Sequence, residues 1–317
     1  MSPVAAFPMM PLVCLILPKH YLIGMYDLEN TIHGLLTNAA PYTGSWRGLR
    51  GQPTPVPRLT VWSSVTATPQ TSSVFEPMFY VVLRGTKVLT MGANRFEMTP
   101  GICAASSFGL PFSYEMTGAT SKLPYVGISL HLDVGRLTQI VLDMPKGEDR
   151  WTCAVAAGDL SGGLGDVFVR LVGLVNTPED VAMLAPHYES EMYYRLLRSS
   201  MGDTLRQIVQ RNDRVRQIKA AADWLGTNNN EPVTISQLAS SAGMSVTSFY
   251  RHFKAITGFS PLAFQRHIRL REARKLLTGG TAMVGSVAYQ VGYQSPSQFS
   301  REYKNMFGSS PVADLQR

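Results

Sequence analysis

The sequence predicts a two-domain α+β protein, in which an N-terminal antiparallel β-barrel with packed helices precedes an all-α domain built from two similar helical units. Three observations lead to this fold class. Short β-prone runs separated by turn signals begin near residue 59. Helical spacing replaces them after Leu137, and one helical pattern occurs twice in the last third of the chain. We divide the chain into residues 1–56, 57–210 and 211–317, and 317 residues suffice for two cores.

Residues 1–56 are predicted to form a largely irregular extension. Residues 1–18 are apolar, but they lack a basic start and are interrupted by Pro8, Pro11 and Pro18, so we expect neither a signal peptide nor a membrane span. Residues 44–57 are rich in Gly and Pro. The three cysteines, Cys14, Cys103 and Cys153, have no paired spacing, so we expect no disulfide framework, no zinc site and a cytoplasmic location.

The middle of the chain is predicted to contain the barrel and its helices. The predicted strands cover residues 78–83, 87–91, 95–98 and 125–133. Short strands at this spacing are typical of a small antiparallel barrel or sandwich. Val167, Leu171 and Leu174 share one helix face, and two or three helices are predicted up to about Gln210. The polar residues 211–216 are the predicted linker.

The repeat aligns residues 249–261 with residues 299–311 without a gap. Both copies read Phe-x-Arg-x-aromatic-Lys-x-x-x-Gly-x-Ser-Pro. Upstream, Ala239 lies four residues before Gly243, as Ala288 does before Gly292. A helix-turn-helix needs a small residue where two helices touch and a glycine in the bend. Two copies in register therefore predict a pair of DNA-reading units.

The first unit carries clear helix-start signals. Residues 234–237 read as a capping box, and Ser245 is the predicted cap of the next helix. On that helix Phe249 and Phe253 are four residues apart and share the buried face. The opposite face is the predicted DNA-binding surface, which consists of Thr247, Tyr250, Arg251 and Lys254.

The second unit follows the same pattern. Ser295 is the predicted cap, and Pro296 occupies the first helical position, where its missing N–H does no harm. Phe299 and Tyr303 are predicted to face inward. The predicted DNA-binding residues of this helix are Ser297, Gln298 and Arg301.

A long helix is predicted between the units, from Ser260-Pro261 to about Leu277. It would span roughly 27 Å, near the ~34 Å repeat of B-DNA, so both reading helices of one monomer fit successive major grooves. Its basic run leaves two alternatives, a solvated face or phosphate contact; the run comprises Arg266, Arg269, Arg271, Arg274 and Lys275.

The charge of the chain is unevenly distributed. Residues 211–317 carry 14 Lys/Arg against 6 Asp/Glu, whereas residues 1–210 carry 15 against 16. A basic excess confined to the part with the repeated helices indicates a phosphate-binding surface.

With these motifs, residues 217–317 closely resemble the tandem helix-turn-helix domain of the AraC/XylS transcription regulators, including the Gly-x-Ser-Pro that closes each unit. One departure is Pro296 with Ser297, where such proteins often carry longer polar readers. Residues 57–200 resemble the cupin-like N-terminal domain of AraC-type regulators. Arg84-Gly85-Thr86-Lys87, Pro100-Gly101 and Leu123-Pro124-Tyr125 carry that resemblance.

The resemblance implies a sequence-specific, ligand-responsive transcription regulator whose N-terminal domain senses or dimerises. The partners that it implies are double-stranded promoter DNA, RNA polymerase, a small-molecule effector and a second copy of the chain. No cofactor and no membrane partner are expected. Two other classes stay open: a cupin-type enzyme with a DNA-binding tail, and a nonspecific architectural DNA-binding protein.

The candidate ligand-binding residues of the barrel are Tyr125, Ser129 and His131, which share one face of a strand whose other face is aliphatic. Such a polar face is either solvated or part of a ligand lumen. The six histidines include no His-x-His pair, and no Ser/His/Asp arrangement is present. We therefore predict no catalytic residue and no metal site.

Overall fold

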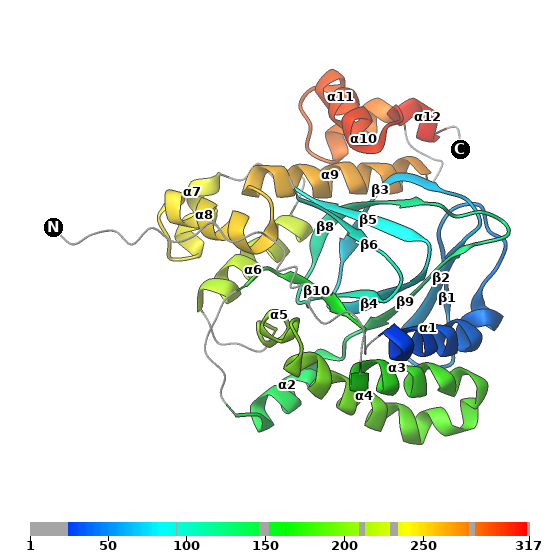
Figure 1. Cartoon of the computed structure of the whole chain (residues 1–317). Coiled ribbons are helices and arrows are strands. Elements are labelled where there is room, and N and C mark those ends of the chain that lie inside the picture. Colours follow the sequence, from blue (N-terminus) through cyan, green and yellow to red (C-terminus); the bar gives the residue numbers. More distant parts are fainter. Residues whose placement is uncertain are drawn as a thin grey trace.

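Two β-sheets form the middle of the molecule, with helices packed on one side and a long helix crossing the other (Figure 1). The structure, a computed structural model, describes residues 25–92, 94–145, 152–160, 162–208, 213–228, 234–278 and 283–315. The predicted irregular segment 1–18 lies outside these ranges. Among the described helices, none is long and apolar enough to cross a membrane.

Regular secondary structure is present upstream of residue 57, where the sequence predicted a largely irregular segment. Helix α1 (Met25–Ala39), the 3-10 turn η1 (Ala40–Tyr42) and strand β1 (Arg50–Pro53) lie within the predicted irregular extension. Pairing with β2 draws β1 into a sheet. The following elements are β2 (Leu59–Ser64), β3 (Thr68–Phe75), β4 (Met78–Arg84), β5 (Thr86–Met91), β6 (Asn94–Met98), β7 (Ile102–Ser106), β8 (Leu110–Thr117), β9 (Tyr125–His131) and α2 (Val134–Asp143).

The strands form two antiparallel sheets that do not close into one barrel. Among the described residues, sheet A has the order β1-β2-β9-β4-β7-β10 and sheet B has the order β3-β8-β5-β6. In sheet A, Val81 of β4 lies opposite both Ile128 and Cys103. Gly85, with a φ of +81°, makes the turn between β4 and β5, a conformation that favours glycine. The cupin-like antiparallel fold is confirmed, with an open barrel.

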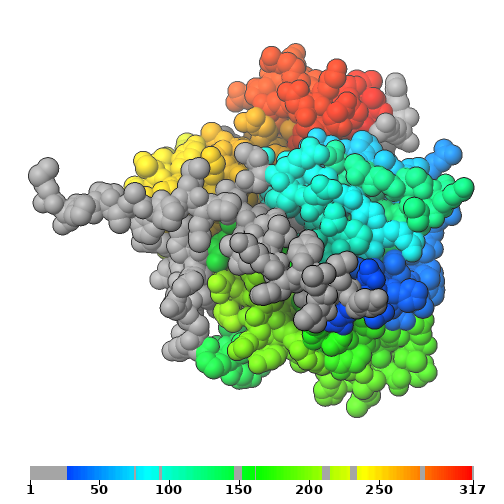
Figure 2. All heavy atoms as spheres, in the orientation of Figure 1, coloured from blue at the N-terminus to red at the C-terminus, as the bar shows by residue number. Residues whose placement is uncertain are grey.

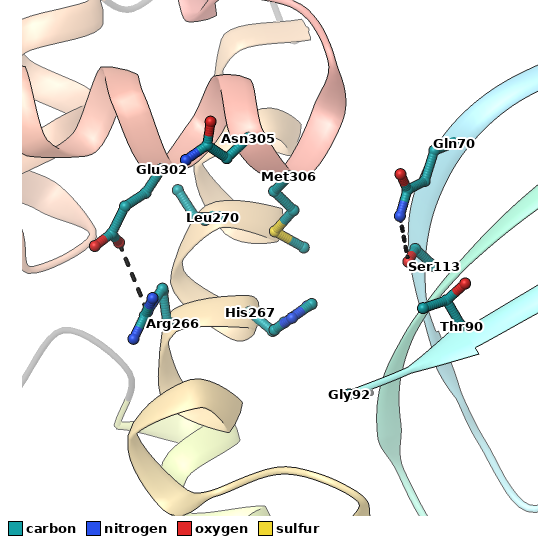
Figure 3. Close-up of a pocket in the computed structure, with 10 residues that line it drawn as sticks. All are labelled: Gln70, Thr90, Gly92, Ser113, Arg266, His267, Leu270, Glu302, Asn305 and Met306. Carbon is teal, nitrogen blue, oxygen red and sulfur yellow. Dashed lines mark hydrogen bonds and ion pairs between the residues drawn. The ribbon is translucent and has the colours of Figure 1, made fainter. Parts of the chain in front are cut away.

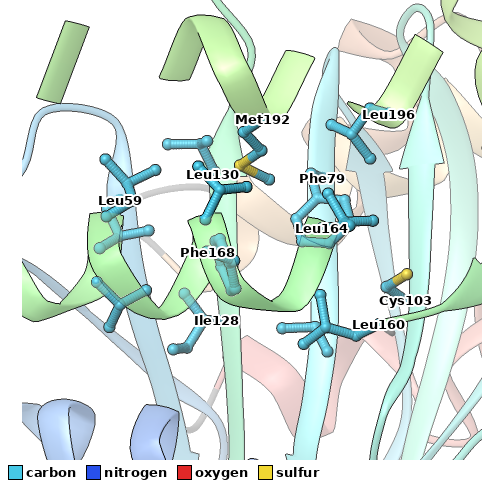
Figure 4. Packing of buried hydrophobic residues seen from close by; sticks show 14 of the residues in the cluster. Leu59, Phe79, Cys103, Ile128, Leu130, Leu160, Leu164, Phe168, Met192 and Leu196 are labelled. Atoms are coloured by element: carbon cyan, nitrogen blue, oxygen red, sulfur yellow. The ribbon is translucent and has the colours of Figure 1, made fainter. Parts of the chain in front are cut away.

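Helices cover the outer face of sheet A. This layer contains α1, α3 (Gly162–Gly173), η2 (Leu174–Asn176), η3 (Pro178–Asp180), α4 (Val181–Arg198) and α5 (Gly202–Arg206), while β10 (Val155–Asp159) joins the sheet beside β7. Strand alternation turns Phe79, Ile128 and Leu130 toward the helices (Figure 4). The rings of Phe79 and Phe168 meet edge to face with centroids 5.3 Å apart. The predicted helices are present, whereas β10 was not predicted.

An ion pair between the exposed Arg58 and the buried Glu189 ties α4 to the loop before β2. Glu189 is 2% exposed, and Arg58 Nη2 donates to its two carboxylate oxygens at 2.8 and 2.7 Å. Burial raises the pKa of Glu189, and the Arg58 and Arg136 guanidinium groups oppose that shift. Because both carboxylate oxygens accept a hydrogen bond from a charged donor, the buried negative charge of Glu189 is compensated.

In the described residues from 213 to 315, every secondary-structure element is a helix, as predicted. It contains α6 (Asp213–Thr227), α7 (Ile235–Ser241), α8 (Val246–Thr257), α9 (Pro261–Thr278), α10 (Val284–Gln290), α11 (Pro296–Phe307) and α12 (Pro311–Leu315). We call α6–α8 the first unit and α10–α12 the second unit. Helix α6 begins at Asp213, so most of the predicted linker 211–216 is helical.

The two units are attached to the sheets in different ways. Phe249 and Phe253 of the first unit belong to the same hydrophobic cluster as Leu89 between the sheets. The backbone N–H of Ala154 also donates to the carbonyl of Ile256 at 3.2 Å. The second unit has a separate core, formed with the end of α9 by residues such as Leu270, Val287, Phe299 and Tyr303. The first core thus continues across the predicted boundary at residue 210.

Candidate nucleic-acid interface

Helix α8 begins and ends at the predicted residues. Ser245 Oγ accepts a hydrogen bond from the backbone N–H of Ser248 at 3.3 Å and satisfies a free donor of the first turn. Gly258 ends the helix with a φ of +84°, the left-handed cap that glycine favours. The capping box on α7 is also present, between Thr234 and Gln237.

One face of α8 is buried and the other is open. Phe249 and Phe253 are both fully buried, with ring centroids 5.5 Å apart. On the opposite face Thr247, Arg251 and Lys254 are exposed, and Tyr250 is half-buried. The four predicted DNA-binding residues therefore share one outward surface, with the spacing of a helix face.

Helix α11 repeats this arrangement in the second unit. Ser295 Oγ accepts from the backbone N–H of Gln298 at 3.3 Å, and Pro296 is the first helical residue. Phe299 and Tyr303 are buried in the core of the unit. The predicted DNA-binding residues of this helix are all exposed; they are Ser297, Gln298 and Arg301.

The cations of the basic domain fall into two groups. On α9, Arg269 Nη1 donates to the carbonyl of Gly292 at 2.9 Å, and Arg274 Nε lies 3.2 Å from Asp314 Oδ2. These contacts hold the second unit on α9. The sequence had predicted either a solvated face or phosphate contact for these arginines, and neither alternative included this structural role. By contrast, Arg251, Lys254 and Arg301 on the reading helices have no ion-pair partner within the described ranges. The reading helices thus keep unpaired positive charge for a polyanion.

Helix α9 connects the two units and separates α8 from α11, the two helices predicted to read DNA. Its 18 residues correspond to roughly 27 Å, near the ~34 Å repeat of B-DNA. Figure 2 shows the first unit in yellow and the second in orange to red, both along the same edge of the molecule. The predicted geometry, in which one monomer reads successive major grooves, is compatible with this spacing.

The predicted ligand-binding face lies between the sheets. Tyr125 and Ser129 are fully buried, so the solvated alternative is wrong for these two residues. The Tyr125 and Tyr80 hydroxyls are 2.7 Å apart, and Trp62 Nε1 donates to Ser129 Oγ at 2.8 Å. His131, half-buried at the end of β9, instead has its Nδ1 3.2 Å from a carboxylate oxygen of Glu76.

Sequence reasoning missed one residue of this interior, Lys87. It is 5% exposed, and its Nζ lies 4.0 Å from the ring centroid of Tyr80 and 4.7 Å from that of Tyr114. The described part of the chain supplies it with no hydrogen bond or ion pair. Burial lowers the pKa of Lys87 to about 7. The signal in the sequence was strand alternation, which places Lys87 on the same face as the buried Leu89 and Met91.

A cavity of about 270 Å³ lies between sheet B, α9 and α11 (Figure 3). Its lining is mostly polar and comprises Gln70, Thr90, Gly92, Ser113, Arg266, His267, Leu270, Glu302, Asn305 and Met306. Burial, with a smaller contribution from Arg266, lowers the pKa of His267 to about 4, so its imidazole is neutral at pH 7. Among the described residues, no group of three or more His, Cys, Asp or Glu side chains is placed to hold a metal ion.

The chain matches two family profiles. The AraC-type transcriptional regulator N-terminus matches residues 55–204, and a helix-turn-helix domain matches residues 238–317. The first covers the sheets and their helical layer, and the second covers both reading helices.

Curated relatives match shorter stretches. The probable thc operon regulatory protein of Rhodococcus erythropolis is 34% identical over 102 residues, which are 31% of this chain and 31% of that protein. The lactose operon transcription activator of Staphylococcus xylosus is 30% identical over 90 residues, or 28% of this chain and 32% of that protein. The chain thus spans about a third of the length of these relatives.

Solved structures of similar fold include ToxT from Vibrio cholerae. One has a TM-score of 0.54 and 11% identity, and the match covers 81% of this chain and 98% of that one. Another, from strain O395 and bound to (E)-4-(8-methylnaphthalen-1-yl)but-3-enoic acid, has a TM-score of 0.52 and 12% identity over 81% of this chain and 98% of that one. At this identity the likeness is one of fold.

Proposed function

Because the chain belongs to the AraC/XylS family of transcription regulators, we propose that it binds specific promoter sequences through α8 and α11 and regulates transcription from them. The observation that carries the proposal is the pair of capped helices, each with an exposed arginine that has no ion-pair partner among the described residues. Arg251 and Arg301 occupy equivalent positions on these helices. Arginine pairs bidentately with guanine in the major groove, so both positions suit base readout.

Affinity for DNA should fall steeply with salt concentration. If the exposed Lys254 and Lys304 each neutralise one phosphate, a plot of log affinity against log salt should have a slope of about −1.8 per monomer. Lys254→Ala should make that slope shallower by about 0.9. Fluorescence anisotropy of the full chain on promoter duplexes between 50 mM and 300 mM salt, roughly the range over which such contacts weaken, measures both slopes.

Lys122→Ala serves as the matched control for that experiment, because Lys122 is an exposed lysine in the loop between β8 and β9. It should leave the slope unchanged. The same titrations on random duplexes test the architectural alternative, which requires equal affinity for promoter and random DNA. Absence of binding to any promoter fragment at low salt would contradict the proposed function.

The effector site that we propose lies in the buried interior between the sheets, around Tyr125, Ser129 and Lys87. An unpaired buried ammonium group is costly, and an acidic ligand would supply the missing counter-charge. Binding would then raise the fraction of Lys87 that is protonated at neutral pH. Such a ligand can change DNA binding only if it favours one arrangement of the reading helices, and the core shared with the first unit offers that connection.

We further propose that the regulator acts in the cytoplasm as a homodimer that contacts RNA polymerase. Dimerisation would raise affinity for paired sites through effective concentration alone. Light scattering of the full chain at micromolar concentration should therefore give twice the 34.8 kDa mass of the monomer. A monomer at these concentrations, with one protein bound per operator, would contradict the dimer.

A further inference from the structure

The side chain of Gln298 is held by a neighbour one turn along α11. Gln298 Nε2 donates to Glu302 Oε1 at 3.1 Å. A carboxylate only accepts hydrogen bonds, so the amide nitrogen must be turned toward Glu302. Among the described residues, the second N–H and the carbonyl oxygen of Gln298 have no hydrogen-bond partner. An amide that offers N–H and C=O together pairs with the N6 and N7 atoms of adenine.

Glu302 is itself anchored to the core of the second unit. Tyr293 Oη donates to Glu302 Oε2 at 2.7 Å, and Arg266 Nε of α9 lies 3.7 Å from the same oxygen (Figure 3). Tyr293 is 7% exposed, and its ring packs against Phe299 with centroids 5.3 Å apart. Both carboxylate oxygens therefore have a partner, and the position of Glu302 is coupled to the buried core.

The carboxylate of Glu302 does not increase affinity for DNA. Glu302 lies on a helix that we propose to face DNA, where a negative charge weakens attraction to the phosphates. Its oxygens are engaged by Tyr293 and Gln298, so direct acceptance from a cytosine amino group would require breaking these hydrogen bonds. What the geometry does provide is a fixed orientation for the amide of Gln298.

We propose that Glu302 is a positioning residue that makes Gln298 select adenine in the major groove read by α11. The inference rests on the proposed function, since it needs α11 to contact bases. It adds a specific base and a second residue to the reading surface, and it links that surface to the cavity that Glu302 and Arg266 line.

The test begins with selection by the full chain from a pool of duplexes with a randomised central 40-base-pair region. The preferred site is then remade with each of the four bases at every selected adenine. Gln298→Ala should lower the preference for adenine at one position about fivefold or more, the lower end of what one bidentate amide–adenine pair contributes. The other positions should keep their preferences.

Two substitutions of Glu302 separate positioning from charge. Glu302→Asp keeps the charge but withdraws the carboxylate from the amide, so the same adenine preference should fall about as far as in Gln298→Ala. Glu302→Gln keeps the reach and an acceptor oxygen, and it should retain the preference. In the Gln298→Ala background Glu302→Asp should cause no further loss, since residues that act as one unit are not additive.

Glu272→Ala is the matched charge control, because it removes a carboxylate from α9 that pairs with Lys275 at 3.8 Å. It should leave the adenine preference unchanged. Thermal unfolding of every variant identifies a purely structural effect. If Glu302→Asp shifts affinity equally for all four bases, or only lowers the unfolding temperature, the positioning role is wrong. If the parent chain enriches no sequence at all, the proposed function fails and this inference fails with it.

Discussion

Replacing Lys87 with methionine should raise the free energy of unfolding, with the largest gain at or below pH 7. The amine has a pKa of about 7 in the folded chain against 10.5 in its ordinary state. That difference sets an upper limit of about 4–5 kcal/mol on the cost of burying it. Contact with the rings of Tyr80 and Tyr114 offsets part of the cost, and we expect a net gain of about 2 kcal/mol. Methionine fits because it is also long and unbranched.

The pH dependence of that gain follows from the direction of the shift. The unfolded chain keeps the Lys87 proton up to about pH 10.5, whereas the folded chain releases it above about pH 7. The cost of burial is therefore complete below pH 7 and decreases as pH rises toward 10.5. The stability difference between Lys87→Met and the parent should narrow by up to about 1.4 kcal/mol per pH unit above pH 7.

Urea unfolding of both proteins between pH 6 and 9 measures this difference. Lys122→Met is the matched control, since that exposed lysine should show neither gain nor pH dependence. Destabilisation by Lys87→Met at every pH would show that the amine supports the fold and carries no burial cost. A residue that lowers stability is retained where function needs it, so Lys87→Met should also abolish the response to an acidic effector.

Replacing Arg251 with alanine should have the largest effect on DNA recognition. One bidentate arginine–guanine pair contributes about 1–3 kcal/mol of discrimination, so the ratio of operator to random affinity should fall about 5- to 150-fold. Arg301→Ala should have a smaller effect. Helix α11 begins with Pro296 and Ser297, which offer less to a base edge than Thr247 and Tyr250 on α8. Competition titrations with operator and random duplexes measure both ratios.

The attachment of the first unit gives a second reason for this asymmetry. The core that α8 shares with the sheets, and the hydrogen bond from Ala154 to Ile256, hold the helix in place before DNA arrives. A reading helix that is already ordered loses less entropy on binding. Lys254→Ala is the internal control, since loss of a phosphate contact should weaken both DNAs alike. An equal loss on both DNAs for Arg251→Ala would assign that arginine to the backbone.

The sequence by itself determined the local features of the DNA-binding part. The caps at Ser245 and Ser295, the glycine that ends each reading helix, and the burial of Phe249 and Phe299 all depend on residues within one or two helical turns. Helical periodicity and capping chemistry are short-range, so a single sequence reports them. The exposure of the predicted DNA-binding residues follows from the same periodicity.

Only the tertiary structure decided which polar faces are buried and which charged side chains have partners within the chain. Strand alternation placed Tyr125 and Ser129 on one face, but only the position of sheet B showed that this face is buried. Likewise, the sequence predicted that Arg269 and Arg274 are either solvated or in contact with phosphates. In the folded chain Arg269 donates a hydrogen bond to the carbonyl of Gly292, and Arg274 forms an ion pair with Asp314. The pairing of β10 with β7 and the core between the sheets and the first unit join residues far apart in sequence. Such contacts leave no periodic pattern, because burial depends on what packs against a face as well as on the residues that form it.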